Sequence, residues 1–334
     1  MRHIKTIDDI TKDGDVEFGE GYDFVATAEE ADAILMRSTD LHGYDLPEGI
    51  RAIARCGAGV NNIPVEEYAR RGVVVFNSPG ANSNAVKELV LAMMILSSRG
   101  VVQSMNWVRA NADDPNILAD AEKAKKAFVG RELKGKRVGV VGLGNVGSKV
   151  ANALVDLGMD VYGYDPFISV EHAWALSQNV QRVGTLEDLC RGCDYLTLHV
   201  PSKADTKGMI STEQLALLAP GAVLINYARE TIIDEDAVHA ALESGKLSWF
   251  AGDFATPKTV LMPNTFITTH SGAGTGEAEA NCADMAISEL KDYLENGNIA
   301  NSVNYPACNM GKALFLSDSS IYALLHSRPF SSFK

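Results

Sequence analysis

One short segment limits the possible fold of this chain more than any other: residues 137–147, RVGVVGLGNVG. An apolar run ends in Gly142-x-Gly144-x-x-Gly147, and SKVANALVDLG follows with a helical pattern. In such a turn the first glycine permits the tight bend, the second lets the backbone approach a pyrophosphate, and the third lets helix and strand pack closely. The anion then lies at the helix N-terminus, where free N–H groups and the helix dipole favour negative charge. The segment predicts a βαβ unit that binds a dinucleotide.

An acid at the end of the next expected strand narrows the choice of cofactor. Asp165 lies in VYGYDPF, where its carboxylate can accept hydrogen bonds from the ribose hydroxyls of adenosine. The same negative charge would repel the additional phosphate of NADP. The pattern therefore favours NAD, and the alternative is a Rossmann-like turn that binds another nucleotide or none.

Short apolar runs alternate with helical patterns along the chain, which is typical of βαβ units. Strands are expected within residues 31–38, 50–59, 72–79, 136–144, 160–165, 195–201, 222–228 and 265–270. The expected fold class is α/β, with two Rossmann-like, doubly wound parallel-sheet domains. A ligand would bind in a cleft between the two domains.

The domain order follows from where the patterns change. Residues 1–100 with 288–312 are expected to form a substrate-binding domain, and residues 101–287 an NAD-binding domain, with a tail of uncertain order at 313–334. The apolar helix expected at 84–97 suits a core or an interface, and the more polar residues 105–135 are typical of a connector.

Composition excludes several other classes of protein. The chain has 334 residues, 46% hydrophobic and 22% charged, with a net charge of -13. This acidity excludes a sequence-independent nucleic-acid binder, which needs a basic surface. The charged N-terminus lacks the apolar core of a signal peptide, and the longest apolar run, residues 89–96, is too short to span a bilayer. We expect a cytoplasmic protein without a membrane or nucleic-acid partner.

The cysteines indicate reduced thiols rather than disulfides or a metal site. There are five, an odd number, and most lie within apolar segments. Cys190 and Cys193 form a CxxC pair, but neither a partner pair nor a thioredoxin-like setting accompanies them. They are expected to be buried small residues beside a turn, and no metal is expected.

Residues 252–274, GDFATPKTVLMPNTFITTHSGAG, raise the question of catalysis. A strand-like run ends at His270 beside small residues, a position suited to moving a proton. A catalytic histidine usually has an acidic partner, yet no Asp or Glu lies between Asp253 and His270. Three possibilities stay open: the histidine is structural, its acid comes from elsewhere in the chain, or it works without one.

Several ordered motifs within about residues 30–312 resemble one enzyme family. They are RCGAGVNNIPVEEYARRGVVVFNSPGANSNAVKELV, VGVVGLGNVG, DYLTLHVP, LINYARETIIDEDAV, THSGAG and NSVNYPACNMGK. Together they resemble the D-2-hydroxyacid dehydrogenases, in particular the D-3-phosphoglycerate dehydrogenase branch. The resemblance implies hydride transfer between NAD and C2 of a 2-hydroxy acid.

The resemblance implies catalytic roles for two residues of this chain, and a third catalytic residue of the family has no counterpart in it. Arg229 would grip the substrate carboxylate and polarise the C2 oxygen, and His270 would exchange the hydroxyl proton. The family's glutamate does not carry over, because the loop after Asp253 is shortened and Lys258 stands at its position. Without that carboxylate, one stabilising partner of a protonated imidazole is missing. Asp253 is expected to contact the nicotinamide carboxamide, or alternatively to turn toward His270.

The resemblance also implies which residues contact the ligands. The expected cofactor contacts are Gly142, Gly144, Asn145, Val146, Gly147, Asp165, Val200, Tyr227, Ala228, Asp253, Gly272, Ala273 and Ser78. The substrate contacts are the backbone N–H groups of Ala58, Gly59 and Val60. Arg37 and Arg55 are candidates for a substrate phosphate, and the alternatives are solvated arginines or structural ion pairs. His199, which recurs with its motif, is expected to be structural.

The expected reaction is NAD-dependent oxidation of D-3-phosphoglycerate to 3-phosphohydroxypyruvate, which feeds serine synthesis. The alternatives are another 2-hydroxyacid dehydrogenase, such as a glyoxylate or hydroxypyruvate reductase, and a non-catalytic NAD-binding regulator. The resemblance further implies a homodimer or homotetramer. Only 22 residues follow the last matching motif, ending at Lys312, too few for the regulatory ACT domain of this branch, so no feedback by serine is expected.

Overall fold

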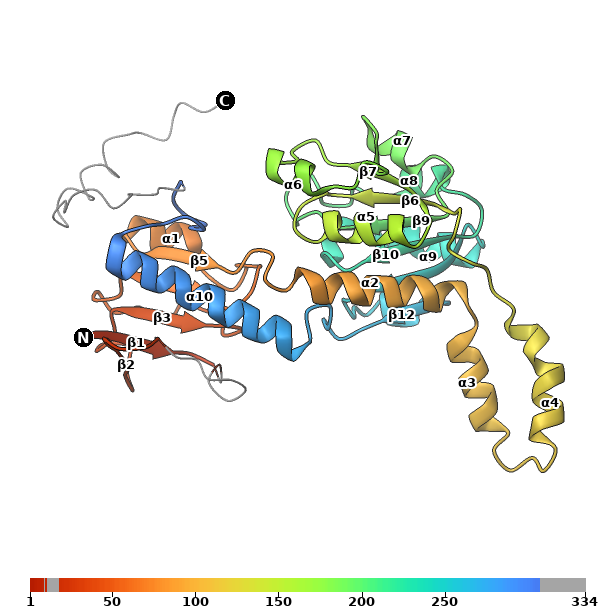
Figure 1. Ribbon diagram of the computed structural model, residues 1–334, viewed down its shortest axis with the longest axis horizontal. Helices are drawn as coiled ribbons and strands as arrows, with labels where there is room; N and C mark the ends of the chain where they lie inside the picture. The colour runs from red at the N-terminus through yellow and green to blue at the C-terminus, as the bar shows by residue number, and fades with distance from the viewer. Residues whose placement is uncertain (9, 11–17, 307–334) are drawn as a thin grey trace. The chain divides into compact units, whose positions relative to one another are not determined.

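The computed structural model describes residues 1–8, 10 and 18–306, and the tail expected at 313–334 lies outside this range. The chain divides into two compact units (Figure 1). The first contains Met1–Ser78 and the described residues from Ala283 onward, and the second is Pro79–Cys282. The domain boundaries were expected near residues 100 and 287. The structure instead has the first boundary after Ser78, so the apolar helix expected at 84–97 belongs to the second unit rather than the first.

The first unit is built on a five-stranded sheet in which every described pair of strands is parallel. Its strand order is β2-β1-β3-β4-β5. The strands are β1 (Arg2–Thr6), β2 (Tyr22–Phe24), β3 (Ala33–Met36), β4 (Ala52–Arg55) and β5 (Val74–Asn77), and the helices are α1 (Val65–Arg70) and α10 (Gly276–Asn296), which begins in the second unit. Near-continuous apolar runs such as AILM in β3 are buried throughout, as expected for strands covered on both faces.

Helix α10 packs onto this sheet through aromatic rings. The ring of Tyr293 lies 5.9 Å from that of Phe76 on β5, and the guanidinium of Arg51 lies over the same tyrosine. The helix reaches the N-terminal strand as well, because Arg2 donates a hydrogen bond of 2.8 Å to the Leu294 carbonyl. The C-terminal part of the described chain is thereby joined to the first five strands.

A carboxyl group on α10 gives this unit a pH-dependent stability. Burial raises the pKa of Glu289 from 4.5 to about 7, against the lowering effect of the Asn301 amide, which donates to it at 2.6 Å. Its Oε2 atom is shielded from water and has no hydrogen-bond partner within the described residues. The folded chain therefore holds this proton more tightly than the unfolded chain does.

Stability should accordingly fall as the pH rises from about 4.5 to about 7, and Glu289→Gln should remove this part of the loss. We expect the variant to unfold at a higher temperature than the wild type at pH 8 and at a similar temperature near pH 4.5. Thermal unfolding across this range measures the difference, with Glu277→Gln, on the exposed first turn of α10, as the control. Equal gains for both variants at pH 8 would contradict the explanation.

The second unit is built on a seven-stranded parallel sheet of order β12-β11-β10-β9-β6-β7-β8. The strands are β6 (Arg137–Val141), β7 (Asp160–Tyr164), β8 (Gln181–Arg182), β9 (Tyr195–Leu198), β10 (Ala222–Asn226), β11 (Leu247–Gly252) and β12 (Thr265–Ile267). The helices are α2 (Ser83–Ser98), α3 (Val101–Ala110), α4 (Ile117–Ala124), α5 (Gly147–Asp156), α6 (Val170–Ala175), α7 (Leu186–Cys190), α8 (Thr212–Leu217) and α9 (Glu235–Glu243), with the 3-10 turns η1 (Lys125–Phe128), η2 (Glu230–Ile232) and η3 (Thr259–Leu261). The α/β fold with two parallel sheets is thus confirmed.

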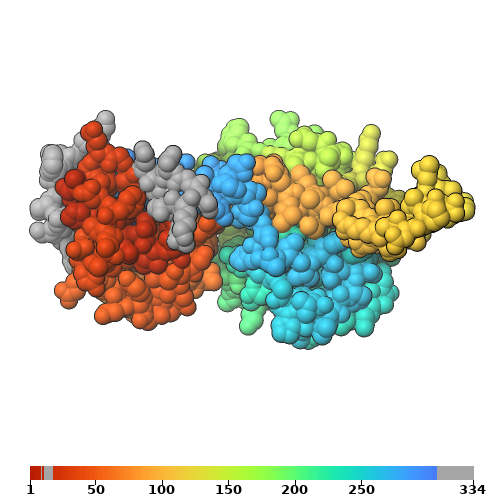
Figure 2. All heavy atoms as spheres, turned by 90° about the horizontal axis from the view of Figure 1, so that it is seen from below, coloured from red at the N-terminus to blue at the C-terminus, as the bar shows by residue number. Residues whose placement is uncertain are grey.

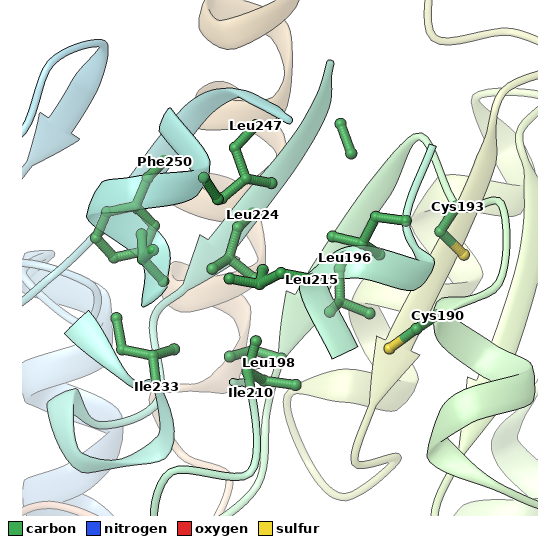
Figure 3. Close-up of a cluster of buried hydrophobic side chains, with 14 of the residues drawn as sticks. Cys190, Cys193, Leu196, Leu198, Ile210, Leu215, Leu224, Ile233, Leu247 and Phe250 are labelled. Atoms are coloured by element: carbon green, nitrogen blue, oxygen red, sulfur yellow. The ribbon is translucent and has the colours of Figure 1, made fainter. Parts of the chain in front are cut away.

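The two faces of the larger sheet enclose separate cores, because successive side chains of each strand point to opposite faces. On β9, Tyr195 packs with α2 and α5, whereas Leu196 and Leu198 pack on the other face with α7, α8 and α9 (Figure 3). Cys190 and Cys193 belong to the second of these cores, and burial raises the pKa of the Cys190 thiol to about 12. The expectation of two buried, unreactive cysteines agrees with this environment.

The residues expected to be a connector form a helical arm. Helices α3 and α4 and turn η1 project from the rest of the second unit in both views (Figures 1 and 2). None of the three contains a buried residue, and their apolar side chains Met105, Val108 and Leu118 are exposed. Within the described residues, no helix has the length and apolar character needed to cross a membrane, and no cluster of potential metal ligands occurs.

Candidate active site at the carboxyl edge of the seven-stranded sheet

The parallel sheet of the second unit gathers the candidate residues along one edge. Strand β6 is followed by Gly142, β7 by Asp165 and β9 by His199. On the other side of the sheet, β10 and β11 lead into the turns that hold Arg229 and Asp253, and His270 follows β12. All the strands are parallel, so these turns lie at the carboxyl edge, and the strand order reverses between β6 and β9. Open α/β sheets bind their ligands at such a switch point.

The glycine turn has the geometry that its sequence predicts. Gly142 has a φ of +85°, and a Cβ there would lie 2.7 Å from the His199 carbonyl oxygen. A Cβ on Gly147 would lie 1.9 Å from the Gly142 oxygen, whereas one on Gly144 would meet nothing within 4 Å. Among the described residues, the N–H groups of Gly144, Asn145 and Val146 donate no hydrogen bond. The turn therefore offers open space and three free donors beside the start of α5, which fits a dinucleotide pyrophosphate.

This geometry predicts opposite consequences for two similar substitutions. Gly147→Ala should destabilise the fold by several kcal/mol or prevent folding, since its methyl group would overlap the Gly142 carbonyl. Gly144→Ala should leave the unfolding temperature unchanged but weaken NADH binding, because the methyl group would enter the space beside the free donors. Thermal unfolding and NADH fluorescence titration of both variants separate the effects. Unchanged NADH affinity in the folded Gly144→Ala protein would contradict this assignment of the space.

Asp165 connects the glycine turn to the loop after β7. Its Oδ2 accepts from the Leu143 N–H at 2.9 Å, and its Oδ1 accepts from the Phe167 N–H at 2.8 Å. Each carboxylate oxygen keeps a second lone pair, so contact with a ribose hydroxyl is compatible with these bonds. The side chain of Asn145, in the glycine turn, also has a partner, since its oxygen lies 3.1 Å from Nε2 of His172.

His199 has a structural environment. Its ring atom Nε2 lies 2.9 Å from the Thr197 hydroxyl, and its backbone N–H donates to the Val141 carbonyl. Desolvation lowers the pKa of His199 to about 3, so the ring is neutral at physiological pH. Val200 follows it, and its Cγ1 lies 2.8 Å from the Cβ position of Gly142. These contacts agree with the expected structural role of His199.

Arg229 lies on a turn shaped by a buried asparagine. Asn226, the last residue of β10, is 1% exposed. It donates to the Arg229 carbonyl at 2.8 Å and accepts from the Ala228 N–H at 3.2 Å. The guanidinium itself donates to the Ala228 carbonyl, and within the described residues it forms no ion pair. Its other donors are available to a substrate carboxylate, which they could bind in a bidentate manner.

Asp253 organises the turn that contains His270. It is 2% exposed, and it accepts hydrogen bonds from the Ser271 and Gly272 N–H groups, each at 2.7 Å, and from the Thr268 hydroxyl. Its backbone carbonyl also accepts from the His270 N–H at 2.9 Å. His270 has a φ of +59°, in the left-handed region that non-glycine residues rarely adopt. The carboxylate and the backbone carbonyl of Asp253 thus fix the turn in which the exposed His270 has this strained conformation.

The shortened loop after Asp253 brings no acid to the histidine. Lys258 forms an ion pair with Asp236 at 2.7 Å, and Glu235 accepts from the Thr256 hydroxyl at 2.9 Å. Within the described part of the chain, no carboxylate is hydrogen-bonded or ion-paired to the His270 ring. The neighbour of the imidazole is Phe254, whose ring centroid lies 4.9 Å from that of His270.

The first unit presents a loop with free backbone donors. Asn77 donates to the Ala58 carbonyl, Arg55 donates to the Gly59 carbonyl, and the Val60 carbonyl accepts from the Ile63 N–H. The N–H groups of Ala58, Gly59 and Val60 donate no hydrogen bond to any described residue. This arrangement suits an anion such as a carboxylate.

The remaining candidates of this unit support the same loop. Arg55 also donates to the Arg37 carbonyl at 2.9 Å, so part of its guanidinium braces the backbone. Arg37 follows β3, and its N–H donates to the Asp8 carboxylate at 2.7 Å. Ser78 is fully buried, and its hydroxyl donates to the Arg55 carbonyl at 3.2 Å. Contact of Ser78 with a nicotinamide, and of either arginine with a phosphate, stays a prediction.

Four residues of these turns were not expected from the sequence: Asn226, Thr268, Phe254 and Asn77. Each supports a neighbouring turn rather than offering a charged group. The position of Asn226 at the end of an apolar strand is a usable signal, since a buried amide there has to form hydrogen bonds, here with its own turn. The contacts of Phe254 and Asn77 join residues 16 and 19 positions apart, and no local pattern announces them.

The comparison with known families agrees with the architecture of the second unit. Residues 91–272, more than half of the chain, match the family described as D-isomer specific 2-hydroxyacid dehydrogenase, NAD binding domain. The matched range includes the glycine turn, Asp165, Arg229 and His270. The chain therefore contains the NAD-binding domain of this family.

Relatives are similar across most of the chain. It is 33% identical to a D-3-phosphoglycerate dehydrogenase of Methanocaldococcus jannaschii, over 92% of this chain and 59% of that protein. It is also 33% identical to that of Bacillus subtilis, over 85% of this chain and 54% of the relative. The chain thus spans little more than half the length of these relatives.

A solved structure is similar over most of the chain. The NAD+-bound 3-phosphoglycerate dehydrogenase of Entamoeba histolytica matches with a TM-score of 0.72 and 28% identity, covering 91% of this chain and 99% of that one. The strand order of the larger sheet, the geometry of the glycine turn and the residues matched by the family all indicate the same NAD-binding domain. The chain belongs to the D-isomer specific 2-hydroxyacid dehydrogenase family.

Proposed function

We propose that this chain is an NAD-dependent D-2-hydroxyacid dehydrogenase whose substrate is D-3-phosphoglycerate. The observation that supports it most is that the turns after β10 and β12, on one edge of the sheet, carry an arginine with no ion pair among the described residues and a histidine in a turn fixed by a buried aspartate. Both residues lie at the edge where this family's cofactor domain binds its ligands.

Each residue has a distinct part in the proposed reaction. When bound, NAD supplies the acceptor, at C4 of its nicotinamide, for the hydride that leaves C2 of the hydroxy acid. Arg229 binds the substrate carboxylate and polarises the C2 oxygen. His270 takes the hydroxyl proton during oxidation and returns it during reduction. The N–H groups of Ala58, Gly59 and Val60 contribute further donors to the substrate carboxylate.

A phosphorylated three-carbon substrate is the finer part of the proposal. Support comes from the printed names of the relatives and from Arg55 and Arg37, which lie beside the free donors of the first unit. The test is the rate of NADH oxidation with 3-phosphohydroxypyruvate, hydroxypyruvate and glyoxylate. We expect kcat/KM to be highest for the phosphorylated acid. A preference for glyoxylate or unphosphorylated hydroxypyruvate would instead assign the chain to a reductase of the same family.

A non-catalytic NAD-binding regulator is the alternative from another functional class. The absence of a carboxylate beside His270 within the described residues is the observation that favours it. Such a protein would bind NADH but turn over no 2-keto acid. The same panel of acids therefore separates a regulator from an enzyme.

We further propose that the chain forms a homodimer through its second unit. The arm formed by α3, α4 and η1 supports this, because short helices without buried residues gain little stability on their own. Its exposed Met105, Val108 and Leu118 would be covered by a second copy. Sedimentation of the wild type and of Leu118→Glu tests the proposal, and a monomeric wild type would refute it.

A further inference from the structure

The rings of Phe254 and His270 are in contact, and the proposed reaction assigns no role to Phe254. The two ring centroids are 4.9 Å apart and the planes are inclined by 51°. Such a distance lies within the range of favourable aromatic contacts. It also lies within the range in which an aromatic face attracts a cation. The phenyl ring is therefore placed to act on the orientation and on the charged form of the imidazole.

The loop after β11 fixes Phe254 through its own hydrogen bonds. Thr259 is 2% exposed, and its hydroxyl donates to the Phe254 carbonyl at 3.1 Å. The same hydroxyl accepts from the Thr256 N–H at 2.8 Å. On the preceding side, the Asp253 N–H donates to the Asn226 carbonyl at 3.3 Å. The backbone on both sides of the Phe254 side chain is thus anchored.

Asp253 and the two acids that contact the loop after β11 are engaged with other groups. Asp253 accepts from the turn 268–272, Glu235 accepts from Thr256, and Asp236 pairs with Lys258. Among the described residues the imidazole therefore has an aromatic neighbour and no carboxylate hydrogen-bonded to its ring. A ring cannot accept a proton, but its negative face stabilises a positive charge and its bulk restricts rotation.

We propose that Phe254 is the positioning residue for His270, taking over the orienting part of a carboxylate partner. The proposal rests on the proposed function, because His270 has to transfer a proton for its orientation to matter. The ring holds the imidazole in the orientation suited to the C2 oxygen and favours the imidazolium that forms during oxidation.

The test compares aliphatic and aromatic replacements. Phe254→Leu should lower kcat by about tenfold and raise the solvent deuterium isotope effect on kcat, because proton transfer becomes slower. The Kd for NADH and the unfolding temperature should change little. Phe254→Tyr and Phe254→Trp, which keep a ring, should restore most of the rate. Phe24→Leu, from a half-exposed ring on β2 of the first unit, is the matched control.

A second measurement covers the case in which Phe254→Leu folds poorly. In a His270→Gln background, replacement of Phe254 by methionine should cause no further loss of the residual rate, whereas with His270 present it should lower the rate. Equal losses in both backgrounds, or a wild-type kcat and isotope effect in Phe254→Leu, would overturn the positioning role. A wild-type chain that binds NADH without turnover would refute the proposed function itself, and the role with it.

Discussion

Asp253→Ala is expected to destroy activity and to lower the free energy of unfolding by about 3–5 kcal/mol. The Ser271 and Gly272 N–H groups would lose their common acceptor, and the Gly272 bond is buried. Only the backbone bond from the His270 N–H to the carbonyl of residue 253 would then hold His270 at its φ of +59°, a conformation that costs about 1–3 kcal/mol. As the turn relaxes, the imidazole should leave its position, and kcat should fall by more than about 100-fold.

The measurements are urea unfolding and steady-state kinetics on the same preparations. Asp253→Asn should give an intermediate loss of stability, because its amide nitrogen cannot accept from one of the two N–H groups. Asp236→Ala, which removes an exposed acid paired with Lys258 in the same region, should change stability little and serves as the control. If Asp253→Ala kept wild-type stability, the carboxylate would not be what holds the turn.

Arg229→Ala should lower kcat/KM for the 2-keto acid by roughly 10²–10³-fold while leaving the Kd for NADH unchanged. The reason is that the guanidinium forms no ion pair with any described residue and is available for bidentate binding of a carboxylate. Arg229→Lys should recover only a minor part of the loss, because an ammonium group cannot reproduce two parallel donors.

The Arg229 prediction is checked by initial rates over a range of keto-acid concentrations, with NADH affinity measured separately by fluorescence. Arg191→Ala, an exposed arginine after α7, is the charge-matched control. A KM and kcat close to wild type in Arg229→Ala would show that another group binds the carboxylate.

The sequence predicts those features of the site that depend on local chemistry. Gly142 and Gly147 can be recognised because a tight turn and a close helix packing exclude a Cβ, as the overlaps at both positions confirm. The parallel sheets follow from buried apolar runs such as those of β3 and β10, which leave little choice of fold. Strands β1, β2, β8 and β11 were not predicted. Strands β1 and β2 mix polar with apolar residues, β8 has only two residues, and β11 follows α9 without a clear apolar run.

The rest of the site depends on contacts between residues distant in the chain. The positions of the acidic residues in the sequence do not reveal that the Asp253 carboxylate accepts hydrogen bonds from Ser271 and Gly272. Nor do they reveal that the ring of Phe254 contacts that of His270. Likewise, the apolar residues of α2 indicate burial but not against which sheet, and they pack against α5 and β10 of the second unit. Such pairings are set by tertiary packing rather than by local propensity.

The most direct test of the central claim is single-turnover oxidation of NADH by the wild type and by His270→Ala with 3-phosphohydroxypyruvate. A wild-type enzyme should oxidise the bound NADH, and His270→Ala should bind it with unchanged affinity while the rate falls by about 10²–10⁴-fold. A wild-type rate in His270→Ala would contradict the assignment of proton transfer to His270. Tight NADH binding without oxidation by the wild type, with any 2-keto acid, would contradict the proposed enzyme activity.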